Sequence, residues 1–451
     1  MALIQPLSEL KIIAKHAGTV LVGQLAVMAY SVTDTIVAGR YSSGSLAALS
    51  VGAAIYISVF VALLGVTQAM LPIWAELHGA KKESAIGQSF RQSLYLCAVT
   101  SAIGMLILFN PAPIFRWTQV PEALRQEALD YLWVLAWTLP PSLLFRLVST
   151  LNQSLGRPLL VTWLQIGSLV VKVPLSIWFA FGGLGLAPRG AVGCALASLV
   201  VGYGLLVVAL WMLRTQPMYQ PLRVWQRLEA PNWRQIGGYA RLGVPSALAV
   251  MVEVTSFTLM ALFIARLGTA AAGSHQIAMN LAALLYMLPL AISIATSARV
   301  SYWLGSGDAA RARHAIKLGL ASVFGLGLLM SGVLLAVRHL LVPIYSSSRE
   351  IADLAVPMLA WVALYHVFDG LQSVGLFVLR CFRVAFVPFV IYAVLLWGGG
   401  LGGGYLLAYQ GLGPWAAMQS PIAFWIMSSL ALGATALSLL LLLRMAATDR
   451  H

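Results

Sequence analysis

The chain has 451 residues, of which 60% are hydrophobic and only 9% are charged, about a third of the charged fraction usual in soluble domains. This composition excludes an ordinary soluble globular protein and indicates an integral membrane protein. The formal net charge of +14 would suit a nucleic-acid partner, but in a membrane protein the positions of the Lys and Arg residues matter more than their sum.

Twelve apolar runs of about 20 residues or more, the length needed to cross a bilayer core, follow one another along the chain. The first six lie near residues 17–39, 47–73, 88–109, 128–148, 158–181 and 190–213. The second six lie near residues 240–265, 275–298, 315–337, 354–378, 386–409 and 415–443. The pattern predicts an all-α integral membrane fold with twelve transmembrane helices. Since the N-terminus lacks the features of a cleaved signal peptide, we expect the first helix to be retained.

A polar, proline-rich segment separates the two sets of helices and is too polar to span. We therefore expect an N-lobe over residues 1–213, a cytoplasmic linker over 214–235 and a C-lobe over 236–451. The halves resemble each other without a gap at an offset of 226 residues, which places Arg40 on Arg266. Because each half has an even number of helices, we expect two six-helix bundles related by a pseudo-two-fold axis along the membrane normal. This architecture indicates a secondary transporter.

The basic residues are distributed unevenly between the loops. Five arginines in and beside the linker mark it as cytoplasmic: Arg214, Arg223, Arg227, Arg234 and Arg241. If both termini share that side, the cytoplasmic ends and loops hold 20 of the 28 Lys and Arg residues, against 7 on the opposite side. The asymmetry predicts that both termini are cytoplasmic. We interpret the net charge as a topology signal and expect no nucleic-acid partner.

Three of the fourteen acidic residues lie deep within predicted spans: Asp34, Glu253 and Asp369. A charge at the bilayer centre costs about 2.5 to 3.5 kcal/mol on insertion scales, so it normally faces a partner or a wet cavity. Each acid is therefore a candidate functional residue, and the alternative for each is a protonated carboxyl held in packing. Carboxylates of this kind can exchange a proton or a sodium ion, as an ion-coupled antiporter requires. We expect H+ or Na+ as the coupling ion and no other cofactor.

Polar residues accompany two of these acids on their own helices. Tyr365, His366 and Gln372 lie three or four residues from Asp369 and share or border its helical face. Tyr365 is the better candidate ligand partner, whereas His366 is a candidate proton relay or else a packing residue. The side chains that could hydrogen-bond Asp34 are Gln24, Tyr30, Thr33 and Thr35.

Lys172 is the only basic residue that the pattern places in the middle of a helix. It either snorkels towards the membrane interface or needs a buried anion. Asp34, in the same half, is the nearest plausible anion.

Enzyme signatures are missing from the sequence. It contains no G-K-[ST], G-x-S-x-G, H-E-x-x-H or CxxC motif. Cys97, Cys194 and Cys381 are scattered through apolar segments, and we interpret them as packing residues. The glycine run of residues 398–404 follows no strand, so close packing or a helix bend is expected there rather than a nucleotide loop. We expect a transporter and not an enzyme.

Four segments resemble the multidrug and toxic compound extrusion (MATE) family, and most closely its bacterial NorM-like branch. They are VTDTIVAGRYSSGSLAALSVG, KVPLSIWFAFGGLGLAPRGAVGCALAS, AAGSHQIAMNLAALLYMLPLAISIATSARVSYWLGSGD and FDGLQSVGLFVLR. The resemblance covers nearly the whole chain. It is most specific in the eighth helix, where HQIAMN, MLPLAISIATSARV and LGSGD follow the family's order and spacing.

The resemblance implies a two-lobed exporter of the bacterial inner membrane that exchanges Na+ or H+ for lipophilic, often cationic, drugs by alternating access. It is expected to act as a monomer. Asp34 matches an acid in the first helix of the NorM-like branch, Glu253 and Asp369 match a pair in the C-terminal lobe, and Tyr365 matches a tyrosine beside that pair. These four are the predicted ion-coupling residues, and Glu253, Asp369 and Tyr365 are the candidate ligands if Na+ rather than H+ is the coupling ion.

The fifth helix departs from the family. Where relatives commonly have two polar residues four apart, often asparagines, this chain has Lys172 and Ser176. An ammonium near Asp34 could occupy the place of a bound cation and shift coupling towards the C-lobe acids, or make Asp34 respond to protons through Lys172. The candidate modulators of coupling are Lys172, Ser176, Gln24, Tyr30 and His366.

A flippase of lipid-linked saccharides from the same superfamily is the alternative function. Such flippases tend to line their cavity with cations and often carry two further helices. Twelve spans, three buried acids and one buried base favour the drug exporter. A membrane-embedded enzyme would need a catalytic pair or a metal cluster in a span, and the sequence indicates neither.

Overall fold

The computed structural model describes residues 6–113, 122–183, 185–346 and 348–448. Within these ranges the chain is helical except for short connections, and its β-structure is limited to two isolated antiparallel bridges, Gly183 with Leu186 and Leu412 with Trp415. Twelve of the described helical segments are long and apolar enough to cross a membrane. The predicted all-α membrane fold with twelve spans is therefore confirmed.

Most of the first six helices extend further than the apolar runs that predicted them. The first six spans are α1 (Pro6–Tyr41), α2 with α3 (Ser43–Gln68 and Met70–Gly79), α4 (Glu83–Phe109), α6 (Glu122–Ser154), α7 (Leu159–Phe181) and α8 (Gly190–Thr215). A short 3-10 helix, η1 (Pro217–Leu222), follows in the linker. The spans are longer because a hydropathy pattern marks the apolar core of a helix, whereas the backbone hydrogen bonds continue into the polar turns beside the membrane.

The second six spans match their predicted positions except at the end. They are α9 (Trp233–Ala265), α10 (Thr269–Gly305), α11 (Ala309–Tyr345), α12 (Arg349–Cys381), the compound segment α13, η2, α14 and η3 (Phe386–Tyr392, Ala393–Gly402, Gly403–Tyr405 and Leu406–Gln410), and α15 (Ile422–Thr448). The predicted start of the last span at residue 415 was wrong. Residues 415–421 are not helical, because Trp415 pairs with Leu412 in an isolated bridge and Gln419 has a φ of 46°.

The glycine run in the eleventh span lets that span pack closely on α15. η2 and η3 are π-helical, so the span is wound more loosely than an α-helix. A Cβ on Gly403 would lie 2.6 Å from the methyl carbon of Met427, and one on Gly404 would lie 2.7 Å from the ring of Phe424. The predicted close packing is confirmed.

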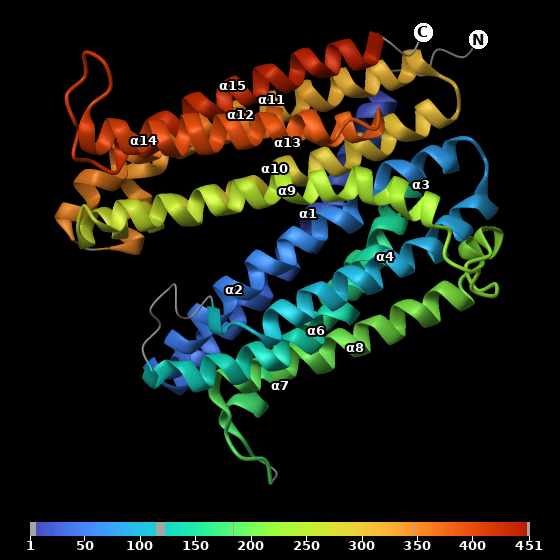
Figure 1. Cartoon of the computed structure of the whole chain (residues 1–451), viewed down its shortest axis with the longest axis horizontal. Helices are drawn as coiled ribbons and strands as arrows, with labels where there is room; N and C mark the ends of the chain where they lie inside the picture. Colours follow the sequence, from blue (N-terminus) through green and yellow to red (C-terminus); the bar gives the residue numbers. More distant parts are fainter. Residues whose placement is uncertain (1–5, 114–121, 184, 347, 449–451) are drawn as a thin grey trace. The chain divides into compact units, whose positions relative to one another are not determined.

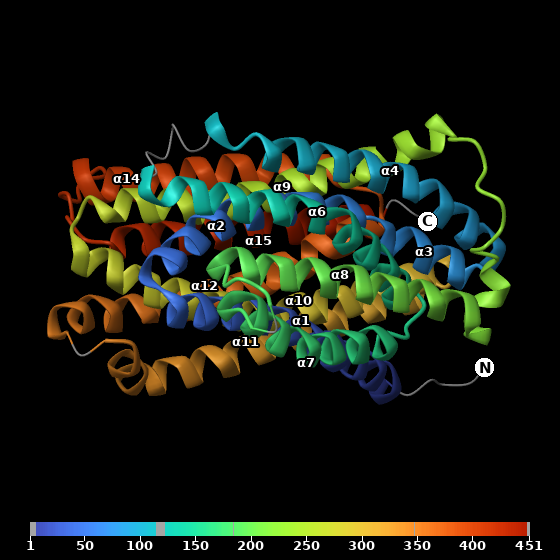
Figure 2. The ribbon, with the colours of Figure 1, turned by 90° about the horizontal axis from the view of Figure 1, so that it is seen from below.

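The described helices pack into two compact units. The N-terminal unit comprises residues 19–247, and the C-terminal unit comprises residues 1–18 and 248–451. In the N-terminal unit α6 packs against α2, α4 and α8, while in the C-terminal unit α12 packs against α10, α11 and α15. Figure 1 and Figure 2 show the long helices of each unit running alongside one another.

The division by packing falls inside α1 and α9 and not at the linker. The first turns of α1 belong to the C-terminal unit because the carboxylate of Glu9 accepts two hydrogen bonds from Arg299, at 2.7 and 2.8 Å. The linker packs within the N-terminal unit. The lobes of residues 1–213 and 236–451 stay a prediction that rests on the sequence repeat.

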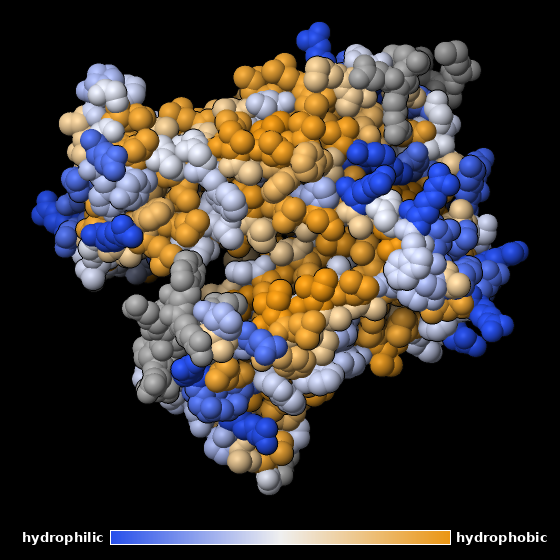
Figure 3. Space-filling view, viewed as in Figure 1, coloured by the Kyte–Doolittle hydropathy of each residue, from blue (hydrophilic) through white to orange (hydrophobic). Residues whose placement is uncertain are grey.

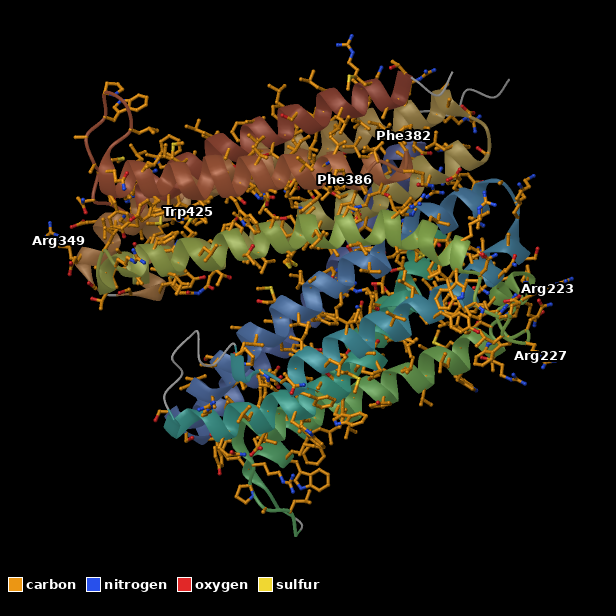
Figure 4. The ribbon with its side chains drawn as sticks, viewed as in Figure 1. Arg223, Arg227, Arg349, Phe382, Phe386 and Trp425 are labelled. Carbon is orange, nitrogen blue, oxygen red and sulfur yellow. The ribbon has the colours of Figure 1, made fainter. Side chains whose placement is uncertain are left out.

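Each unit has an apolar flank. Figure 3 shows apolar side chains along the helices and hydrophilic ones gathered at the helix ends. Large hydrophobic residues stand exposed on these flanks, among them Leu106, Val170 and Leu437, as expected of helices that face lipid. Arg223 and Arg227 lie together in the linker at one end of the N-terminal unit (Figure 4). The extreme termini lie outside the described residues, as does Arg116, one of the 7 basic residues counted on the side opposite the linker.

Candidate functional site

Asp34 and Lys172 form a buried ion pair inside the N-terminal unit. The Nζ atom of Lys172 lies 2.8 Å from Oδ1 and 3.0 Å from Oδ2 of Asp34. The Lys172 side chain has no solvent exposure, and Asp34 has 8%. The snorkelling alternative for Lys172 is therefore wrong, and the buried anion that it requires is Asp34.

Helices α7 and α8 supply the remaining partners of the ammonium group. Lys172 Nζ donates to Ser198 Oγ at 2.7 Å, to Ser176 Oγ at 3.4 Å and to the carbonyl of Cys194 at 3.5 Å. Ser176 also donates to Asp34 Oδ1, at 3.2 Å. Ser198 was missed because sequence alone does not tell which face of α8 meets α7. The pair is thus fully hydrogen-bonded without a bound ion.

The hydrogen-bond partners predicted for Asp34 on its own helix were wrong. Thr33 and Thr35 donate to the carbonyls of Ala29 and Ser31, one helical turn back.

The other two predicted partners also lie away from the carboxylate. The Tyr30 hydroxyl is hydrogen-bonded to Ser168, and its ring lies 5.7 Å from Lys172 Nζ. Gln24 is ten residues before Asp34, about 15 Å along the helix axis, so it cannot reach the carboxylate. It lines a separate cavity of about 10 Å³.

A large cavity adjoins the ion pair within the same unit. Its volume is about 330 Å³. Asp34 lines it together with aromatic side chains, of which the main ones are Tyr30, Tyr56, Phe60, Tyr131 and Phe145. Cavities of this size and lining are typical of small-molecule sites. Arg146, which the sequence analysis did not single out, also lines it.

Glu253 and Tyr365 line a second, much smaller cavity, in the C-terminal unit. Its volume is about 20 Å³, close to what one water molecule needs. Glu253 comes from α9 and Tyr365 from α12, and no described residue hydrogen-bonds or ion-pairs with the Glu253 carboxylate. Glu253 is thus a half-buried acid beside a space for one small occupant.

Asp369 is buried on α12, one turn beyond Tyr365. Its Oδ1 accepts a hydrogen bond of 2.9 Å from Gln372, as their helical spacing predicted. The carboxyl groups of Asp369 and Glu253 are close enough for their charges to interact. The structure therefore brings Glu253, Asp369 and Tyr365 together, as expected.

Aromatic rings form one wall of the small cavity. The Tyr365 ring packs edge-on against Phe257 and Trp425, with centroids 5.8 and 5.7 Å apart. Trp425, labelled in Figure 4, donates from Nε1 to His275 Nδ1 at 3.2 Å. These contacts fix the ring of Tyr365 beside Glu253.

Several buried polar atoms of α12 lack a hydrogen-bond partner among the described residues. They are Nε2 of His366, Oε1 of Gln372 and all three guanidinium nitrogens of Arg380. Arg380 was missed as a buried cation. Its spacing could have found it, because eleven residues separate it from Asp369, close to three full helical turns, and this places both on one face.

The described residues contain no group of three or more His, Cys, Asp and Glu side chains that could hold a metal ion. The candidate Na+ ligands are therefore two carboxylates and a phenol. The three cysteines are buried and none forms a disulfide among the described residues, in line with a packing role.

The fold and these sites define a membrane transporter with twelve spans, and comparisons with known proteins identify its family. The profile described as MatE matches residues 20–178 and 245–406. The chain belongs to the multidrug and toxic compound extrusion (MATE) family. It is accordingly a transporter and not an enzyme, and its spans and bacterial relatives make it a multi-pass protein of the bacterial inner membrane.

Two curated relatives and one solved structure illustrate the similarity. A probable multidrug resistance protein NorM from Aromatoleum aromaticum is 35% identical over 412 residues, which cover 91% of this chain and 88% of the relative. The multidrug resistance protein MdtK of Yersinia pseudotuberculosis is 31% identical over 433 residues, covering 94% and 92%. The crystal structure of the Vibrio cholerae MATE transporter VcmN in its bent form shares the fold with a TM-score of 0.84 at 17% identity, covering 98% of both chains.

Proposed function

We propose that this protein is a secondary active multidrug antiporter, which exports lipophilic or cationic compounds in exchange for H+ or Na+ by alternating access. The observation that carries the proposal is the small cavity lined by Glu253 and Tyr365, near Asp369, where no described basic residue hydrogen-bonds or ion-pairs with either acid. The curated relatives, which are named as multidrug resistance proteins, support the drug class of the substrate.

The C-terminal acids are the proposed coupling site because a cation would satisfy them. Glu253 has no hydrogen-bond or ion-pair partner among the described residues, and Asp369 has only the amide of Gln372. A cavity of about 20 Å³ holds one water molecule or one small cation. Asp34, in contrast, already forms an ion pair with the ammonium group of Lys172. We therefore assign cation exchange to Glu253, Asp369 and Tyr365.

One monovalent ion per cycle is enough to drive export. A single charge that crosses a potential of about 100 mV releases about 2.3 kcal/mol. Since about 1.4 kcal/mol corresponds to a tenfold concentration ratio, this supports a gradient of roughly fifty-fold.

Either ion fits the chemistry of the site. A proton would neutralise one acid of the pair, and His366, buried with a free Nε2, is the candidate relay. A sodium ion would take oxygen ligands from Glu253, Asp369 and Tyr365. Transport into vesicles under separately imposed Na+ and H+ gradients distinguishes the two.

We further propose that both termini are cytoplasmic and that the monomer is the transporting unit.

A flippase of lipid-linked saccharides remains the alternative function. The cavity of about 330 Å³ in the N-terminal unit matches a drug-sized compound rather than a saccharide on a lipid carrier. The twelve spans found among the described residues also agree with a drug exporter, whereas such flippases often carry two further helices.

Removal of either C-terminal acid tests the proposal. Glu253→Gln and Asp369→Asn keep the side-chain size but cannot bind a cation by charge, so each should abolish ion-driven efflux of a lipophilic dye from cells that make normal amounts of protein. Glu350→Gln is the matched control, because Glu350 is an exposed acid at the start of the same helix as Asp369, and it should transport normally. Full efflux by both site variants would refute the assignment.

A further inference from the structure

The C-terminal unit buries an arginine that makes no hydrogen bond or ion pair with any described residue. Arg380, in the last turn of α12, is 1% exposed, and all three of its guanidinium nitrogens lack a partner. The ring of Phe377 covers one face of the guanidinium group, with 4.6 Å between its central carbon and the ring centroid. Phe382, which follows this end of α12, is labelled in Figure 4. An unpaired charge within a membrane span is costly and normally serves a function.

Arg380 shares this unpaired state with the coupling acids. Among the described Asp, Glu, Lys and Arg residues of the C-terminal unit, those that are buried are Glu9, Asp369 and Arg380. Glu9 forms an ion pair with Arg299 at 2.7 Å. Asp369 has the amide of Gln372 as its hydrogen-bond partner, and no described cation pairs with it.

The arginine and the acids belong to one region of the unit. Arg380 lies eleven residues after Asp369, about 16 Å along the helix axis and on the same face of α12. A long side chain in a helix points back towards the N-terminus, which brings the guanidinium group closer to Asp369 than the backbone spacing. Tyr286 of α10 and Tyr392 of α13 are neighbours of both, since the charges of the two acids and of the arginine act on each phenol. The Tyr392 hydroxyl is also buried without a partner among the described residues.

The net charge of this region follows from its titratable groups. The phenols that face the acids are those of Tyr286, Tyr365 and Tyr392, and a phenol is neutral at physiological pH. No described titratable side chain of α11 or α15, which also pack on α12, acts on the acids or on Arg380. When both acids are ionised, Arg380 offsets one of them, and the region has one net negative charge.

The charge of Arg380 acts on the acids without contact. Over about 10 Å and at an effective dielectric constant of about 20, two unit charges change the affinity for an ion about tenfold. One bound monovalent cation makes the region neutral. A second cation would make it positive and would be repelled by the guanidinium group.

We propose that Arg380 is the third charge of the coupling site, and that it limits the monovalent cations exchanged at Glu253 and Asp369 to one per cycle. The inference rests on the proposed function, because it sets the stoichiometry of the coupling assigned there to the two acids. Arg380 is a positioning residue that acts on the bound ion through its charge.

The ion gradient that just stops dye movement measures this number. Purified protein is placed in vesicles with a tenfold gradient of ethidium, the membrane potential is held at zero, and the gradient of the driving ion, Na+ or H+, is varied. One exchanged ion stops net dye movement at an ion gradient of about tenfold, whereas two ions do so at about threefold, since their free energies add. We expect about tenfold for the wild type.

Variants of Arg380 then test the role of its charge. Arg380→Gln leaves two net negative charges, so the gradient that stops dye movement should fall towards about threefold. Arg380→Lys keeps the positive charge and should match the wild type. Arg444→Gln is the matched control, because Arg444 is an exposed arginine on α15 in the same unit, and it should also match the wild type.

A double variant separates the charge of Arg380 from a structural role. Glu253→Gln alone leaves Asp369 offset by Arg380, so the site needs no cation and transport should be lost. Glu253→Gln combined with Arg380→Gln again has one net negative charge, and it should regain part of the ion-driven dye transport. Loss of an arginine that only supports the fold would not restore transport.

The outcomes distinguish this inference from the proposed function. A wild type that stops dye movement at about threefold overturns the inference even if no Arg380 variant folds. The same conclusion follows if Arg380→Gln behaves as the wild type, if Arg380→Lys behaves as Arg380→Gln, or if the folded double variant is no more active than Glu253→Gln. A wild type that moves no dye under either ion gradient would instead overturn the antiporter proposal.

Discussion

At the scale of single residues, the N-terminal acid differs from the C-terminal pair because it has its own cation. Lys172 supplies a positive charge at 2.8 Å from Asp34, and three further groups hold that ammonium in place. The Glu253 carboxylate lacks such a partner among the described residues. Asp34 is thus already paired with a cation, whereas Glu253 has no cationic partner among the described residues, although both are lone acids in apolar runs of the sequence.

Removal of Lys172 should destabilise the protein more than removal of the whole pair. Lys172→Met leaves Asp34 as a buried acid with only Ser176 beside it, and loss of one partner of a buried pair costs about 3 to 5 kcal/mol. The double variant Lys172→Met with Asp34→Asn removes the uncompensated charge and should recover most of the lost thermal stability in detergent. A double variant as unstable as the single one would show that the pair does not act as a unit.

At the scale of elements, the ion pair depends on the close approach of α7 and α8. Gly193 lies in the first turn of α8, and a Cβ there would be 2.4 Å from the carbonyl oxygen of Phe179 in α7. Backbone atoms cannot move aside as a flexible side chain can. This contact helps to bring Cys194 and Ser198 to Lys172.

Gly193→Ala should therefore push the two helices apart, at a cost of about 1 to 3 kcal/mol. Gly204→Ala in the same helix is the control, because nothing lies within 4 Å of a Cβ at that position, and it should be neutral or stabilising. Thermal unfolding followed by fluorescence compares the two. Equal effects of both substitutions would contradict a role for the close approach.

At the scale of the whole molecule, the linker is held to the helices of its own unit by an ion pair and by several hydrogen bonds. The carboxylate of Glu229 accepts a hydrogen bond of 2.9 Å from Arg91 Nε and a second from its Nη2. Tyr95 donates to the carbonyl of Glu229 at 2.7 Å, and Gln92 donates to the carbonyl of Ala230 at 3.0 Å. The linker is thus part of the N-terminal unit rather than a loose tether.

This contact should make stability depend on pH. The hydrogen bonds and the charge of Arg91 hold the pKa of Glu229 below its ordinary value of 4.5. A group whose pKa is lower in the folded than in the unfolded state stabilises the folded state at pH values above its unfolded pKa. This contribution is lost as the pH falls through the folded pKa. Glu229 is partly exposed, so the effect should be small.

The measurement compares wild type with Glu229→Gln. At neutral pH the variant should unfold at a slightly lower temperature, and the difference should shrink as the pH falls below about 4 and wild-type Glu229 is protonated. A difference that does not change with pH would refute a contribution from the ionised pair.

The sequence by itself determined the class of fold and the identity of the buried acids. Long apolar runs must be helical in a bilayer, since a lipid-facing backbone has to satisfy its own hydrogen bonds, and a lone acid in such a run stands out for the same reason. Asp34, Glu253 and Asp369 could therefore be found from their surroundings along the chain, as could the contact of Gln372 with Asp369, which depends only on helical spacing.

The tertiary structure alone decided which groups meet across helices. Hydropathy does not tell how a helix is rotated about its axis, so the contact of Ser198 with Lys172 and the entry of Arg146 into the large cavity could not be predicted. For the same reason the hydroxyls predicted beside Asp34 serve their own helix or a neighbour. A buried acid can be identified from the sequence. Whether it pairs with a lysine or has no cationic partner depends on side chains from helices far away in the sequence.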